Sequence, residues 1–192
     1  MIRVLPLLLA LAACVPAADG ANGFGPGVRD IAAQRVRFAA EAICLNNRTR
    51  RAQESEARAL DFPIVERDGN ATVFVNPGTL TFVRIGPAPD QAYLDEAGTR
   101  RVVSGNGCSV GSPAVGVELA NRLAGEILTP RLVDGSGILE APRGAGTNPD
   151  GGVGFFFEGL AVTLPLARTT FTDPETDEGL AFDHPVILIV HG

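Results

Sequence analysis

The stretch "ATVFVNPGTLTFVRIG", residues 71–86, decides the fold class. Apolar and polar residues alternate on both sides of Asn76-Pro77-Gly78, a triplet typical of a tight turn. Alternation with a period of two is expected of a strand that buries one of its faces. The stretch therefore predicts two antiparallel strands, 72–75 and 79–85, joined by a turn.

Segments on both sides of this hairpin have helical spacing instead. Residues 28–45 predict an amphipathic helix, and residues 49–60 predict a weaker second one. A third helix is expected at 112–128, with Ser112 as N-cap and Pro113 at the first helical position. The apolar positions of the first helix are Val28, Ile31, Phe38, Ala42 and Leu45.

Three further segments are expected to be strands, namely 99–104, 153–168 and 185–192. A glycine-rich stretch, 134–154, predicts a long loop. Helical and alternating segments are segregated along the chain, which favours an α+β fold over a doubly wound one. We expect one globular α+β domain over 28–192, with a mainly antiparallel sheet that two or three helices cover on one face.

The first twenty residues, "MIRVLPLLLALAACVPAADG", have the pattern of an export signal. The apolar run from Val4 to Ala13 is shorter than the about 20 residues that a membrane-spanning helix needs. Its end, Leu11-Ala12-Ala13-Cys14, resembles the lipobox of bacterial lipoproteins. That resemblance implies a signal peptide over 1–13, lipidation of Cys14 after cleavage, and attachment of the protein to a membrane through the lipid.

The residues after Cys14 indicate how the domain is attached and to which of the two membranes the protein goes. Residues 14–27 are small and rich in glycine, so they predict a flexible tether between lipid and domain. In the lipoprotein family an Asp directly after the cysteine often retains the protein at the inner membrane. Val15 stands there, which favours the outer membrane and a domain that faces the periplasm. The alternative is an ordinary secretory signal, cleaved after Ala17 or Ala18.

Export leaves two cysteines to be explained, Cys44 and Cys108. Disulfides persist in oxidising compartments outside the cytoplasm, so an even number of remaining cysteines favours a bond between these two. The alternative is two buried thiols, because free cysteine is among the most buried residue types.

Residues 107–111, Gly-Cys-Ser-Val-Gly, also spell G-x-S-x-G, the pattern of a nucleophile elbow. Under that alternative Ser109 is the nucleophile of a lipid-anchored serine esterase, His184 is the base, and Asp134 or Asp173 is the acid. Helices and a hairpin precede Ser109, however, where such hydrolases need several parallel strands. We therefore predict that Ser109 belongs to the turn into the helix at 112–128 and assign no catalytic residue.

Composition narrows the remaining function classes. A net charge of −6 and a pI near 4.9 argue against nucleic acid as a partner. The acidic segment 173–178 lacks the spacing of a calcium-binding loop, and His184 and His191 have no neighbouring ligands, so no metal or cofactor is expected. Phe155-Phe156-Phe157 is interpreted as a core strand rather than a ligand groove. The favoured function is a small periplasmic domain that binds a protein or another envelope component.

Overall fold

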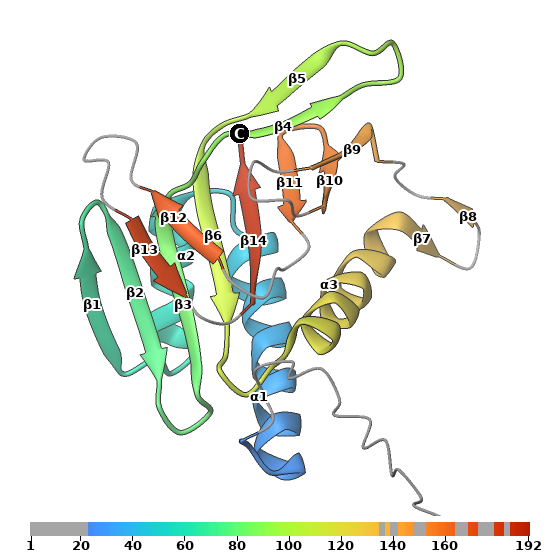
Figure 1. Ribbon diagram of the computed structural model, residues 1–192. Helices are drawn as coiled ribbons and strands as arrows, with labels where there is room; N and C mark the ends of the chain where they lie inside the picture. Colours follow the sequence, from blue (N-terminus) through green and yellow to red (C-terminus); the bar gives the residue numbers. More distant parts are fainter. Residues whose placement is uncertain are drawn as a thin grey trace, which may run out of the picture.

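A computed structural model describes residues 23–134, 137–138, 142–147, 153–163, 169–172, 179–182 and 185–192. Within these residues an eight-stranded sheet forms the centre of the fold (Figure 1). All neighbouring strands of this sheet are antiparallel, and the helices pack on it, so the predicted α+β class is confirmed. The strands across the sheet are β1 (Ile64–Asp68), β2 (Ala71–Asn76), β3 (Thr81–Pro87), β6 (Asn106–Gly111), β14 (Val186–His191), β11 (Leu160–Thr163), β10 (Val153–Phe157) and β9 (Gly144–Thr147).

The helices cover one face of the sheet. They are α1 (Pro26–Ala39), which continues directly as the π-helix η1 (Ala40–Leu45), α2 (Arg50–Ala59) and α3 (Val117–Leu132). The helices and this face of the sheet share one buried apolar cluster. Its members on the sheet are Phe74, Val83, Ile85, Cys108, Val110, Phe157, Leu160, Val162, Ile187 and Ile189.

A second, smaller core lies on the opposite face. It is partly covered by the hairpin of β4 (Gln91–Leu94) and β5 (Arg100–Val103), where Tyr93 stacks on Phe156 with ring centroids 4.5 Å apart. Phe156 and Phe157 are fully buried, so the expectation that the phenylalanine run is a core strand is confirmed. The strand expected at 99–104 exists, but it pairs only in this separate hairpin.

Two further short strand pairs complete the described elements. They are β12 (Thr169–Thr172) with β13 (Gly179–Phe182), and β7 (Val133–Asp134) with β8 (Gly137–Ile138). β9 lies inside the stretch 134–154 that was expected to be a loop, and it pairs with β10 at the edge of the main sheet. The loop prediction is wrong there because sheet pairing at this edge overrides the weak strand propensity of a glycine-rich segment.

The stretch around Cys108 differs most from the prediction. Residues 106–111 do not turn into a helix; they form β6, a central strand between β3 and β14. The following helix begins only at Val117, with Gly116 at its cap. Ser112 is therefore not an N-cap: its Oγ accepts a hydrogen bond of 3.1 Å from the Ala114 backbone N–H in the preceding turn.

The buried face of α1 also differs from the one expected of an amphipathic helix. Its buried residues are Ala32, Ala33, Val36 and Ala39, whereas the large apolar residues Val28, Ile31 and Phe38 are exposed. Small side chains let the helix lie close to the elements that it covers. Apolar spacing alone identified the helix but not the side that it buries.

Glycines of β6 are required by close packing rather than by backbone freedom. A Cβ on Gly107 would lie 2.4 Å from the Cβ of Ala88, and one on Gly111 would lie 2.6 Å from the ring of Phe82. Gly105 alone of the three glycines at 105, 107 and 111 has a positive φ, of 156°. Close packing, and not backbone freedom, therefore requires glycine at positions 107 and 111.

We predict that Gly107→Ala lowers the free energy of unfolding by about 1–3 kcal/mol, because the added methyl group overpacks the sheet against Ala88. The matched control is Gly125→Ala in α3, where an added Cβ meets nothing within 4 Å. That change should raise stability by about 0.5–1 kcal/mol through helix propensity. Urea unfolding followed by circular dichroism measures both, and equal effects of the two variants would contradict the packing argument.

Candidate functional site

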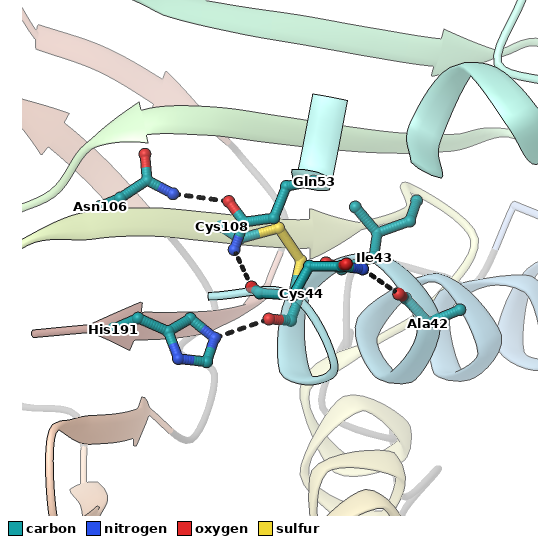
Figure 2. The surroundings of a disulfide bond; sticks show 8 residues. Ala42, Ile43, Cys44, Gln53, Asn106, Cys108 and His191 are labelled. Carbon is teal, nitrogen blue, oxygen red and sulfur yellow. Dashed lines mark hydrogen bonds between the residues drawn. A yellow bond between two sulfur atoms is a disulfide. The ribbon is translucent and has the colours of Figure 1, made fainter. Parts of the chain in front are cut away.

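A disulfide joins the end of the helical segment to the centre of the sheet (Figure 2). Cys44 lies in the last turn of η1 and Cys108 lies in β6, with their Cα atoms 5.4 Å apart. Both cysteines are fully buried. The bond closes a sequence separation of 64 residues, and it is the pairing that the cysteine count favoured.

Polar side chains surround this disulfide and hydrogen-bond one another (Figure 2). The fully buried Gln53 of α2 donates from Nε2 to the carbonyl oxygen of Asn47 at 2.8 Å. Its Oε1 accepts a hydrogen bond of 2.5 Å from Nδ2 of Asn106, the first residue of β6. One amide side chain thereby connects the loop after η1 to the sheet.

Side chains near the disulfide also donate hydrogen bonds to the last backbone carbonyl groups of the α1–η1 segment. Asn47 Nδ2 donates to the carbonyl oxygens of Ala42 and Ile43, at 2.7 and 3.2 Å. His191 Nε2 donates to the carbonyl oxygen of Cys44 at 2.7 Å. Backbone carbonyls at the end of a helix lack partners within it, so these contacts fix how the segment ends.

Sequence reasoning missed most of this cluster. The Asn46-Asn47 pair, directly after the predicted helix at 28–45, was a usable sign, since Asn is common after a helix. Gln53 and Asn106 carry no local sign of their role, because they meet only after α2 packs beside β6. His191 was considered only as a metal ligand, whereas it lies against the backbone of Cys44.

Burial lowers the pKa of His191 below its usual 6.5, and the positive charges of Arg48 and Arg131 lower it further. The hydrogen bond to the Cys44 carbonyl opposes this effect but does not reverse it. The neutral imidazole, with its proton on Nε2, is therefore the form that suits the folded protein.

Ser109 lies away from this cluster, on the other face of the sheet. Successive residues of a strand point to opposite faces, so Ser109 and Cys108 point to different sides of the sheet. Asn106 points to the same side as Cys108, and its strand partner His191 shares that side. Ser109 is buried, and its neighbours across the sheet are Arg84 and Leu188. A serine in the middle of a paired strand is not on a strand-to-helix elbow.

The other residues of the esterase alternative are not brought to Ser109 by the described structure. Asp134 is the last residue of β7, beyond α3. His184, Asp173 and the acidic segment 173–178 lie outside the described residues, as does Cys14 with the segment 1–13. Among the residues that are described, no group of three or more His, Cys, Asp or Glu side chains is placed to hold a metal ion.

A pocket of about 610 Å³ opens beside the β4–β5 hairpin. Its lining includes two ion pairs, Arg101 with Asp95 at 2.9 Å and Arg143 with Glu158 at 2.6 Å. Hydrogen bonds from Arg101 and from the Thr99 backbone N–H lower the pKa of Asp95. Tyr93 adds an aromatic surface, so the pocket offers both charge signs and a ring to a small polar ligand.

No protein-family model, no curated protein and no solved structure matches this chain. The function is therefore argued from the residues and their arrangement.

We predict that Cys44→Ala lowers the free energy of unfolding by about 2–5 kcal/mol, because it removes the cross-link over the 64-residue separation. The double variant Cys44→Ala/Cys108→Ala should be no less stable than the single one, and a reductant should destabilise only the wild type. Denaturant unfolding measures all three proteins. Alkylation of Cys44 and Cys108 in unreduced, denatured wild type, mapped by mass spectrometry, would contradict the bond.

We also predict that acidification through the range just below pH 6.5 destabilises the protein through His191. Its folded pKa lies below the unfolded one, so its contribution is complete above about pH 6.5 and is lost as the pH falls, by at most about 1.4 kcal/mol per pH unit. Glu54 and Asp95 have pKa values lowered from 4.5 and 3.8, so they titrate in more acidic solution. Urea unfolding at a series of pH values measures the slope.

The control for this prediction is His191→Gln, which keeps a side-chain N–H donor near Cys44 but does not titrate. It should show little pH dependence in the same range, while His184→Gln, which removes the other histidine of the chain, should keep the wild-type slope. Equal slopes for the wild type and His191→Gln would show that His191 is not the titrating group.

Proposed function

We propose that this chain is a bacterial lipoprotein of the cell envelope, anchored through lipid on Cys14. The single observation that carries the proposal is the sequence Leu11-Ala12-Ala13-Cys14 after a short apolar run. Several acyl chains on one residue hold a protein firmly, because each buried methylene group contributes about 0.8 kcal/mol to membrane attachment. Val15, in place of Asp, supports the outer membrane over the inner one.

The described fold agrees with such an anchor. A buried disulfide is typical of proteins that fold in an oxidising compartment, and the periplasm is one. Among the described residues, no helix has the length and apolar character to cross a bilayer. Helix α1 begins at Pro26, which is 12 residues after Cys14 in the sequence.

We further propose that the domain binds another envelope component, and the pocket beside the β4–β5 hairpin supports this role. Its paired charges and the ring of Tyr93 suit recognition of a polar ligand. The position of Ser109 in the middle of β6 gives no support to the esterase alternative. A binding role is therefore favoured over a hydrolytic one.

We predict that Cys14→Ser abolishes membrane attachment, because serine has no thiol to accept the diacylglyceryl group. In fractionated cells the wild type should sediment with the membranes, and the mass of its mature form should equal that of residues 14–192 plus lipid. The Cys14→Ser variant should lack the lipid and leave the membrane fraction. Wild type recovered without lipid from the soluble periplasm, with an N-terminus after Ala17 or Ala18, would contradict the proposal.

Val15→Asp is the matched control, because it tests which membrane receives the protein and not whether the protein carries lipid. It leaves the thiol in place, so lipid attachment should persist, while the family's retention pattern predicts a shift toward the inner membrane. Separation of the two membranes by density measures this shift.

A further inference from the structure

Helix α1 carries an exposed apolar stripe beside the side that it buries against the core. Val28, Ile31 and Phe38 are 42%, 55% and 47% exposed, respectively. Their spacing of three and seven residues places them on one side of the helix. The adjacent side of the helix is already buried through Ala32, Ala33, Val36 and Ala39. The helix therefore has two apolar sides, and the domain itself covers only one of them.

This stripe lies close in sequence to the residue that the lipobox pattern marks for lipidation. Phe24 packs against the main core, so it fixes the point where the chain joins the domain. Cys14 lies ten residues before it, a separation of at most about 36 Å when fully extended. For a flexible chain of this length the average separation is roughly 16–19 Å. The start of α1 is therefore held within a short distance of any membrane that holds the lipid.

We propose that this stripe lies on the phospholipid surface of the membrane to which Cys14 anchors the chain. This inference rests on the proposed lipid anchor. The tether keeps the stripe at a high local concentration near the bilayer, so even weak apolar contacts are enough to hold the stripe on the membrane surface. Helices with large apolar residues on one side bury that side about 5–10 Å into the boundary between headgroups and acyl chains.

The geometry of α1 suits a helix that lies flat on the surface. From Val28 to Phe38 the rise is about 15 Å, so both ends touch the bilayer only if the axis is parallel to it. Polar residues flank the stripe: Arg37 pairs with Glu41 and, on α3, with Glu126. The net charge of −6 gives no overall attraction to anionic lipid, so added salt should not weaken the docking.

This docking gives the domain an orientation. The β4–β5 hairpin and its pocket lie at the end of the molecule opposite to the start of α1 (Figure 1). With α1 flat on the membrane, the pocket is displaced from the docked stripe along the direction of the helix axis.

The chain contains no tryptophan, which provides a direct test. Phe38→Trp places a single fluorophore on the stripe, and Leu94→Trp places one on the hairpin, where Leu94 is 60% exposed. Each lipidated, full-length mature protein is reconstituted in vesicles of phosphatidylethanolamine and phosphatidylglycerol with brominated acyl chains. We expect a blue-shifted emission that bromine quenches for Phe38→Trp, and neither effect for Leu94→Trp.

A charge on the stripe should reverse this result. Ile31→Asp, added to Phe38→Trp, should abolish the blue shift and the quenching while the lipid still holds the protein on the vesicles. Leu94→Asp in the same background is the matched control and should change neither. Val28→Trp provides a second fluorophore position if Phe38→Trp does not fold.

The outcomes separate the docking from the anchor. Protein that carries lipid and floats with the vesicles, but whose tryptophan at 38 is unquenched, overturns the docking alone. Equal quenching at positions 38 and 94 overturns it too, since no side is then preferred. A blue shift in detergent means that the chain itself covers the stripe. A blue shift only in native envelopes means that another protein covers it. Either result also overturns the docking on phospholipid. A mature protein without lipid overturns the anchor and the docking together.

Discussion

The disulfide between Cys44 and Cys108 is the constraint on which the rest of the structure depends. It joins the end of the α1–η1 segment to β6, the strand that connects the β1–β3 half of the sheet to the β14–β9 half. The surrounding hydrogen bonds of Gln53, Asn106 and His191 act between the same elements. Helices and sheet are thereby fixed to each other at one buried point, where these polar groups have hydrogen-bond partners.

Small residues make this arrangement possible. Gly107 and Gly111 let neighbouring elements approach β6 to distances that a methyl group would prevent. The alanines of α1 do the same on the helical side, where they leave the larger Val28, Ile31 and Phe38 outside. The central strand therefore does not have the strongly apolar alternation that identifies strands, and the buried side of α1 is not its most hydrophobic one.

These features connect the fold to the proposed role. The disulfide cross-links the domain at its centre, and the exposed apolar stripe of α1 lies at the end where the described residues begin. The pocket with its paired charges lies at the other end. In the proposed envelope lipoprotein, we assign the stripe to contact with the membrane and the pocket to ligand binding.

The sequence by itself determined the α+β class, the β2–β3 hairpin, the helical segments and the pairing of the two cysteines, because periodicity and cysteine count are local or compositional properties. It also carries the lipobox pattern on which the proposed anchor rests. Only the tertiary structure decided that residues 106–111 are a central strand, since Gly107, Ser109 and Gly111 gain their strand partners from β3 and β14. It also decided that Ser109 and His191 lie on opposite faces, that Gln53 meets Asn106, and which side of α1 is buried. Each of these depends on contacts between residues far apart in the chain, and no local pattern encodes such contacts.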